Sequence, residues 1–297
     1  KYFNEILNYF NNDKMPNKIL FSGNKGVGKS TLAYHLINSI LSINEEHGYD
    51  QKNFTINDLN KSYKLIQNNT HPNFYLIDLV EDKKNIDISQ IRKMIAYTNK
   101  SCLNDKPRFI LIDNIEYLNN NSTNALLKVI EEPNDNVFFF LIHNNEKKIL
   151  STLKSRCLTL NINFSFTQNV KITNLILEDD ISKLINIDLF NYYNSPGELV
   201  KLIKFAQDNN IDLSKYSLTD FLKLLIDNNY YKKNKFINNI LKKYIELYFL
   251  KKYSFTPIKN SLLKKYHTFI KKVNNTEKFN LDEESLFLEF RSKLINE

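Results

Sequence analysis

The chain has 297 residues, of which 42% are hydrophobic and 25% are charged, a balance that excludes an intrinsically disordered protein. This length exceeds one ordinary core and predicts two or three compact units. The longest uninterrupted apolar run, Val137 to Ile142, is too short for a membrane span, which needs roughly 18 apolar residues. The only two cysteines, Cys102 and Cys157, exclude a disulfide scaffold and are typical of a reducing cytoplasm.

The formal net charge is +8, but the basic residues follow a compositional bias. The chain contains 37 Lys, 4 Arg and 45 Asn, as an AT-rich genome would produce, so its charge alone is weak support for nucleic-acid binding. The stretch 231–272 is different, because it holds 12 Lys and a single acid, Glu246. Apolar residues recur through this stretch at helical spacing, so the lysines are interpreted as solvated helix faces. Long-range attraction to DNA phosphates is the alternative.

The elements predicted up to about residue 165 alternate between helices and buried strands. Continuous apolar runs predict short strands, and apolar residues at helical spacing predict helices. Alternation of this kind predicts a parallel sheet with helices on both faces, an α/β fold. Residues 43–70 are polar and predict no element. The expected strands are 19–21, 74–77, 109–112, 137–142 and 158–162, and the expected helices are 1–17, 30–41, 88–95, 122–132 and 149–154.

Beyond residue 165 the strand pattern ends and helical periodicity continues. One small helical unit is predicted over 164–206, with a turn at Asn194-Ser195-Pro196-Gly197, and a second all-α unit over 207–297. The apolar faces of the second unit exceed what a solvated tail needs, so we expect them to mediate assembly. These faces include Leu222, Leu224, Leu225, Leu286, Phe287 and Phe290.

Three of the chain's five glycines fall within Gly23 to Ser30, which matches the P-loop pattern G-x-x-x-x-G-K-[ST] in full. A predicted strand precedes this loop and a predicted helix follows it. Backbone N–H groups of such a loop turn toward phosphate oxygens, Lys29 would reach the β- and γ-phosphates, and the Ser30 hydroxyl would join a Mg²⁺ shell. The predicted nucleotide-binding residues are Gly23, Asn24, Lys25, Gly26, Val27, Gly28, Lys29, Ser30 and Thr31.

A second metal-ordering acid is predicted at Asp113, which follows the buried strand 109–112. Many P-loop ATPases place Glu at the next position to activate the attacking water, but this chain has Asn114, which cannot take a proton at neutral pH. Glu116 lies past the strand, and we expect it to point elsewhere. The sequence therefore predicts nucleotide binding with weak or absent hydrolysis.

Arg156 stands out because Lys replaces Arg almost everywhere else in this chain. An arginine kept in Ser155-Arg156-Cys157 suggests that its planar fork is needed, and not only its charge. A surface salt bridge is the alternative interpretation. Cys157 has no His or Asp partner pattern and is interpreted as a small buried residue and not as a nucleophile.

Four motifs together resemble the bacterial clamp-loader AAA+ subunits, most closely the delta-prime subunits of DNA polymerase III. They are the P-loop, the strand ending at Asp113, the N-A-L-L-K-x-x-E-E-P run from Asn124 to Pro133, and Ser155-Arg156-Cys157. The resemblance is dense from about residue 16 to residue 160. It implies an AAA+ nucleotide-binding domain over 1–163, a helical lid over 164–206 and a helical collar or oligomerisation domain over 207–297.

The resemblance also implies roles for single residues. Arg156 would be an arginine finger, acting in trans at the γ-phosphate on a neighbouring subunit. Asn144 lies where the family has its sensor 1 polar residue, although a polar turn residue is an equally good interpretation. The lid arginine of active subunits would fall at Gly197 and is missing. Residues 38–75 contain no Cys, so no zinc is implied where many relatives carry a zinc module.

The function implied by the resemblance is that of a stator subunit in a cytoplasmic heteropentamer. Such a subunit helps to load the sliding clamp on primed DNA, binds ATP or ADP with Mg, and works within the DNA polymerase III holoenzyme without clear catalysis of its own. Its expected partners are tau/gamma-type ATPase subunits and a delta subunit, with no membrane. The alternative is an active AAA+ motor subunit of a clamp loader or related machine. A P-loop kinase is disfavoured by the Ser155-Arg156-Cys157 motif.

Overall fold

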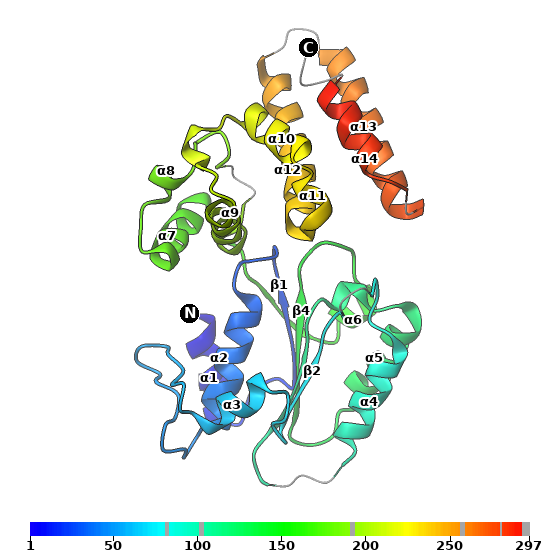
Figure 1. The fold of residues 1–297 in the computed structure, drawn as a ribbon. Helices are drawn as coiled ribbons and strands as arrows, with labels where there is room; N and C mark the ends of the chain where they lie inside the picture. The colour runs from blue at the N-terminus through cyan, green and yellow to red at the C-terminus, as the bar shows by residue number, and fades with distance from the viewer. Residues whose placement is uncertain (81–82, 101–103, 191–193, 256–258, 280, 293–297) are drawn as a thin grey trace. The chain divides into compact units, whose positions relative to one another are not determined.

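The computed structural model describes residues 1–80, 83–100, 104–190, 194–255, 259–279 and 281–292. They form two compact units, Lys1–Ser165 and Phe166–Glu297. In Figure 1 the first unit runs from blue to green and contains the sheet, and the second runs from green to red and is helical. Cys102 lies outside the described residues.

The first unit is built on a five-stranded sheet in which every neighbouring pair is parallel. The strand order is β2-β3-β4-β1-β5, so β1 lies between β4 and β5. Because all strands run the same way, their carboxyl ends meet at one edge of the sheet. The strands are β1 (Lys18–Ser22), β2 (Phe74–Ile77), β3 (Arg108–Ile112), β4 (Val137–His143) and β5 (Leu158–Asn161).

Helices cover both faces of this sheet, which confirms the predicted α/β fold class (Figure 1). Most residues of the three central strands β1, β3 and β4 are therefore buried on both sides, and Phe21 and Phe140 contact each other with ring centroids 5.3 Å apart. On one face lie α1 (Tyr2–Asn11), α2 (Lys29–Leu41) and α3 (Lys61–Gln67). On the other lie α4 (Ile88–Thr98), α5 (Asn120–Glu131) and α6 (Ser151–Lys154), with a 3₁₀ turn, η1 (Ile115–Tyr117), between β3 and α5.

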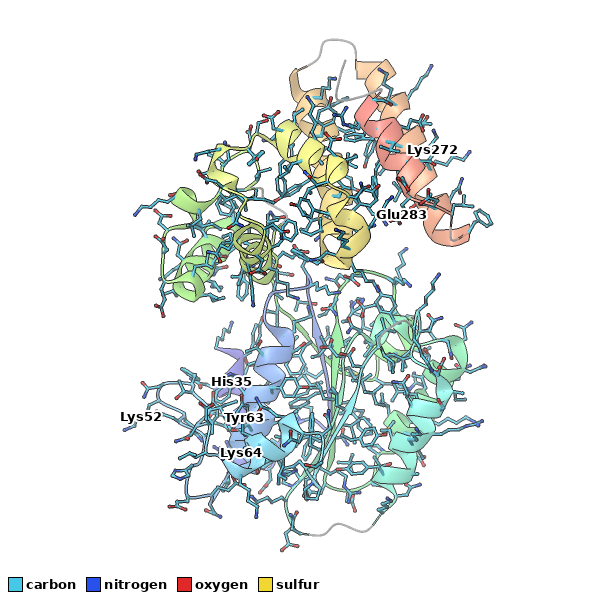
Figure 2. The ribbon with its side chains drawn as sticks, in the orientation of Figure 1. His35, Lys52, Tyr63, Lys64, Lys272 and Glu283 are labelled. Carbon is cyan, nitrogen blue, oxygen red and sulfur yellow. The ribbon has the colours of Figure 1, made fainter. Side chains whose placement is uncertain are left out.

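Helix α3 is the α-helix of the first unit that the sequence did not predict. It has only seven residues, fewer than a reliable helical periodicity requires. Local chemistry starts it, because the Asn60 side chain accepts a hydrogen bond from the backbone N–H of Tyr63 at 2.6 Å. Ile66 then anchors the helix in the core. Tyr63 and Lys64 of this helix are labelled in Figure 2.

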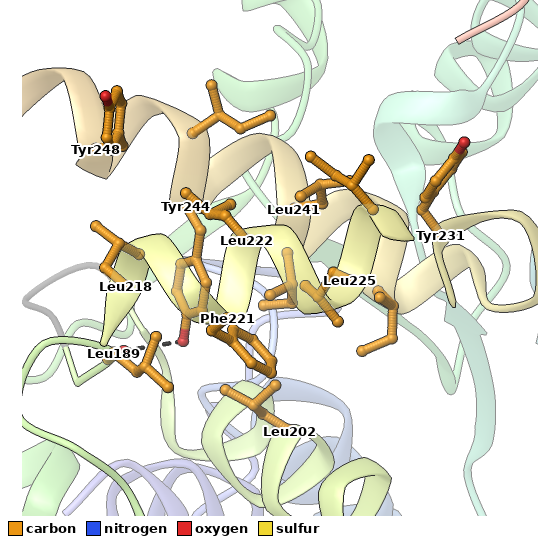
Figure 3. Packing of buried hydrophobic residues seen from close by; sticks show 14 of the residues in the cluster. Leu189, Leu202, Leu218, Phe221, Leu222, Leu225, Tyr231, Leu241, Tyr244 and Tyr248 are labelled. Atoms are coloured by element: carbon orange, nitrogen blue, oxygen red, sulfur yellow. Dashed lines mark hydrogen bonds between the residues drawn. The ribbon is translucent and has the colours of Figure 1, made fainter. Parts of the chain in front are cut away.

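All regular elements among the described residues of the second unit are helices, as predicted, and the unit buries one large hydrophobic cluster. Phe221 and Tyr244 lie at its centre, and the Tyr244 hydroxyl donates a 2.9 Å hydrogen bond to the Leu189 carbonyl (Figure 3). The elements are α7 (Phe166–Leu177), α8 (Ile181–Leu184), α9 (Pro196–Asp208), η2 (Leu213–Lys215), α10 (Leu218–Asp227), α11 (Tyr230–Lys233), α12 (Lys235–Phe255), α13 (Lys259–Phe279) and α14 (Glu284–Phe290).

The division of the helical region at residue 206 stays a prediction, since residues from both sides of it share this cluster. The apolar faces of 207–297 were expected to mediate assembly, but most of them are covered within the unit itself. Most of the residues that suggested it pack inside the unit's own core: Leu222, Leu225, Leu286, Phe287 and Phe290. Their apolar character is explained by this core.

The lysine-rich stretch 231–272 is partly neutralised by acids from other segments of the second unit. Lys242 pairs with Glu283 at 2.8 Å, and Lys232 pairs with Glu284 at 2.6 Å. Lys272 pairs with Glu289. Glu283 and Lys272, which belong to different pairs, are labelled in Figure 2. Two further pairs in this stretch join Lys243 to Glu198 and Lys251 to Asp188. The described lysines of this stretch lie on solvated helix faces, and several of them also form ion pairs within the second unit.

Candidate functional site

The P-loop connects β1 to α2 at the carboxyl edge of the sheet, where the sequence predicted it. A Cβ on Gly23 would lie 2.1 Å from the Ile162 carbonyl oxygen, so no side chain fits there. Gly26 and Gly28 both have φ of 83°, a left-handed backbone that glycine adopts without strain. Glycine is therefore required at Gly23 because a side chain would clash, and it is favoured at Gly26 and Gly28 because their backbone is left-handed.

The side chains of the loop divide into buried and exposed ones. Val27 packs into the core of the first unit, whereas Asn24, Lys25 and Thr31 are exposed. Lys25 pairs with Glu146 at 3.2 Å. The exposed residues border the loop on its solvent side, where a bound molecule would meet them.

Lys29 is buried at the first turn of α2, and its Nζ faces the loop. It donates hydrogen bonds to the carbonyl oxygens of Gly23 at 2.8 Å and Asn24 at 2.7 Å. Burial lowers the pKa of Lys29 to about 8, although the carboxylates of Asp113 and Glu116 favour its charged form. The loop therefore holds a cation whose charge is incompletely compensated.

Ser30 and Asp113, the two predicted metal ligands, are brought together. The Ser30 hydroxyl donates to the Asp113 carboxylate at 2.7 Å. Burial raises the pKa of Asp113, the hydrogen bond from Ser30 lowers it, and the nearby Asp78 carboxylate raises it further. A hydroxyl and a carboxylate are oxygen ligands of the kind that Mg²⁺ prefers, so these residues fit the ion.

Asn114 links three strand ends through its side-chain amide. Its Nδ2 donates to Asp78 Oδ1 at 2.7 Å, and its Oδ1 accepts from Asn144 Nδ2 at 2.8 Å. The backbone of Asn114 is left-handed, with φ of 57°, which Asn tolerates better than most residues. Asp78 follows β2, and Asn144 follows β4. Asn144 thus lies beside Asn114, and its sensor role stays a prediction, while Asp78 was not foreseen.

Glu116 corrects one expectation, because it does not point away from the site. It is buried, and its Oε1 accepts the backbone N–H of Asn144 at 2.9 Å. Among the described residues, its Oε2 has no hydrogen-bond partner. Glu116 was misjudged because η1 turns the chain back toward the end of β4 directly after Asp113.

Arg156 lies between α6 and β5, and its guanidinium is held by two acceptors. Its Nη2 contacts Glu131 Oε1 at 2.6 Å, and its Nη1 donates to the Thr152 carbonyl oxygen at 2.8 Å. The surface salt bridge considered as an alternative is therefore present, on a side chain that is 35% exposed. Cys157 is half-buried, and burial raises its pKa to about 11, so a reactive thiolate is disfavoured.

A P-loop at the carboxyl edge of this parallel sheet, next to an acid at the end of β3, defines a P-loop domain of AAA+ type. The family described as "DNA polymerase III, delta subunit" matches residues 1–165, more than half of the chain. The chain therefore belongs to this clamp-loader family, whose curated relatives here include delta-prime subunits of DNA polymerase III.

Two curated relatives illustrate the similarity. The DNA polymerase III subunit delta' of Bacillus subtilis is 29% identical over 197 residues, which cover 66% of this chain and 56% of the relative. The DNA polymerase III subunit gamma/tau of Mycoplasma genitalium is 31% identical over 223 residues, or 74% of this chain and 32% of the relative. The chain matches between 30% and 56% of the length of three delta' relatives.

A solved structure supports the fold over nearly the whole chain. It is a DNA polymerase III gamma subunit-related protein from Thermotoga maritima, with a TM-score of 0.51 and 16% identity. The match covers 93% of this chain and 94% of that one. At this identity the similarity concerns the fold alone. Within the described part of the chain, none of the helices combines the length and hydropathy that crossing a membrane requires.

Proposed function

We propose that this chain is a delta-prime-type stator of a clamp loader, and that it helps to place a sliding clamp on primed DNA. Family membership supports the general role, and the gamma/tau relative supports partnership with ATPase subunits of that type. A delta subunit would complete the assembly. A cytoplasmic location, as expected from the sequence, goes with this role.

The observation that carries the proposal is the combination of an intact P-loop with an amide at position 114. Lys29, Ser30 and Asp113 form the arrangement that a Mg-nucleotide needs. Bound Mg²⁺ would neutralise charge on the phosphate oxygens. Both polar groups of Asn114 are already hydrogen-bonded, and an amide cannot accept a proton from water. The chain would therefore hold ATP or ADP with little hydrolysis.

Arg156 supplies the second part of the proposal. Its guanidinium is partly exposed and lies on the first unit, where a neighbouring subunit could reach it. Transfer of a phosphoryl group spreads charge over the equatorial oxygens, and a guanidinium can donate aligned hydrogen bonds to them. We propose that Arg156 acts in this way in trans. An active motor subunit is the weaker candidate, because Asn114 and Gly197 replace the acid and the arginine that it would need.

The experiment compares nucleotide binding with turnover. Calorimetry should detect Mg-ADP binding by the wild-type chain and by Lys52→Ala, which changes an exposed lysine outside the P-loop, but not by Lys29→Ala. Steady-state ATPase of the chain alone should be negligible, and Arg156→Ala should lower the ATPase of the complex with its partner subunits. Turnover by the isolated chain at about 1 per second or faster, as in a working enzyme, would refute the stator role.

A further inference from the structure

Arg156 forms an ion pair with the carboxylate of Glu131. Glu131 is the last residue of α5, and Thr152 lies in the short helix α6. The Arg156 guanidinium bridges the two, with Nη2 on Glu131 Oε1 at 2.6 Å and Nη1 on the Thr152 carbonyl at 2.8 Å. Helices α5 and α6 also pack against each other. The guanidinium is thus held by two elements of a folded scaffold.

We infer that Glu131 is a positioning residue for Arg156, which it holds ready for the phosphate of a nucleotide bound to a neighbouring subunit. This inference rests on the proposed finger role of Arg156. An unheld arginine samples many rotamers, and binding to phosphate must then restrict all of them. Restricting the side chain beforehand removes part of that entropy loss.

The geometry leaves the guanidinium able to act. Glu131 and Thr152 engage one N–H on each of its two terminal nitrogens, so other N–H donors remain for an incoming phosphate oxygen. A lysine could not do this, because its ammonium lacks a planar fork that fixes several donors at once. The requirement explains why Arg persists here in a chain with 37 Lys and 4 Arg.

A purely stabilising role fits the pair less well. The Arg156 side chain is 35% exposed and the Glu131 side chain 48% exposed. Ion pairs with this much solvent contact contribute little to folding stability. Fixing the direction of one side chain requires much less interaction energy than stabilising a fold, and a solvent-screened pair can supply it.

Glu132 offers a matched control. It is the next residue, carries the same charge and is also exposed, yet no ion pair with it occurs among the described residues. Replacing Glu132 by Gln therefore changes the net charge and the local field as Glu131→Gln does, without touching the guanidinium.

The first test needs no partner and no activity. The full chain with labelled arginine side chains should give few guanidinium signals by NMR, because the sequence has 4 Arg. Arg156→Lys identifies the signal of residue 156. We expect hindered rotation of this guanidinium in the wild type and in Glu132→Gln, and free rotation in Glu131→Gln. Free rotation already in the wild type would overturn the inference.

The second test measures turnover by the complex with the partner ATPase subunits. Glu131→Gln should lower kcat by about two- to five-fold, the range that a screened ion pair supports, with KM unchanged and melting temperature unchanged. Glu132→Gln should match the wild type. Equal kcat for the two variants would overturn the positioning role, as would a rise in kcat, which would mean that Glu131 restrains the arginine.

The two proposals fail in different ways. If Arg156→Ala keeps full turnover in the complex, the finger role itself is wrong. If Arg156→Ala loses turnover while Glu131→Gln does not, only the role of Glu131 is wrong. Should Glu131→Gln fail to assemble, the NMR comparison on the unassembled chain decides.

Discussion

Nucleotide binding should depend on pH in a way that the burial of Lys29 determines. Its pKa is lowered to about 8, so the free site is fully protonated at pH 6 and about half protonated at pH 8. A phosphate beside the ammonium favours the charged form. Binding should therefore leave Lys29 protonated and take up the missing fraction of a proton, which is close to zero at pH 6 and about one half at pH 8.

The sign of the effect follows from the lowered pKa. Affinity should be constant below about pH 7 and should fall as pH rises through 8, approaching tenfold per pH unit above it. Calorimetry of Mg-ADP binding in two buffers with different ionisation enthalpies gives the proton uptake directly. Lys52→Ala is the control, because Lys52 is an exposed lysine of the first unit that lies outside the P-loop. Binding with no proton uptake at pH 8 would show that Lys29 does not meet the phosphate, or that its pKa is not lowered.

Three further predictions concern the backbone, the core and the two units. Gly23→Ala should lower the free energy of unfolding by about 3 kcal/mol, because its Cβ would lie 2.1 Å from a backbone oxygen. A Cβ at Gly28 would meet nothing within 4 Å, so Gly28→Ala should lower the free energy of unfolding by about 1–2 kcal/mol, from its positive φ alone. Urea denaturation of the two variants measures both losses, and equal losses would contradict this reasoning. Tyr244→Phe should lower the stability of the second unit by about 1 kcal/mol through loss of the bond to Leu189, and an unchanged urea midpoint would contradict it. A fragment 1–165 should stay monomeric and folded by gel filtration and circular dichroism, whereas a fragment 1–206 should aggregate because it exposes the apolar face of α9; a monomeric 1–206 would favour a separate lid.

The fold of the first unit could be predicted from sequence because its central strands β1, β3 and β4 are mostly buried on both faces. Such strands read as continuous apolar runs, and the predicted 109–112 and 137–142 differ from β3 and β4 by one residue each. Helix α3 escaped prediction, because a side-chain cap and a single buried anchor leave no periodic pattern. The packing of the helical unit could not be predicted either, since periodicity tells which face is apolar but not which helix covers it.

The candidate site shows the same limit. The P-loop was predictable because its residues are contiguous and their order carries the chemistry. Asp78 and Glu116 lie outside the P-loop. The pairing of β2 with β3 places Asp78 beside Asn114, and the η1 turn together with the pairing of β3 with β4 places Glu116 beside Asn144. One signal was present for Asp78, since an acid directly follows the apolar run 74–77, as Asp113 follows 109–112. The sequence did not show that these two strands are neighbours.

The ion pairs of the lysine-rich stretch affect how the second unit would respond to a polyanion. At least five of its twelve lysines already have carboxylate partners. A lysine that pairs with a carboxylate must break this ion pair before it can neutralise a DNA phosphate. The release of a counterion from DNA is then offset by a carboxylate that is left without its partner. A plot of the logarithm of any DNA affinity against that of the salt concentration should therefore be shallower than twelve free lysines would give. The stretch has a high formal charge, but at least five of its lysines are already engaged by carboxylates of the second unit.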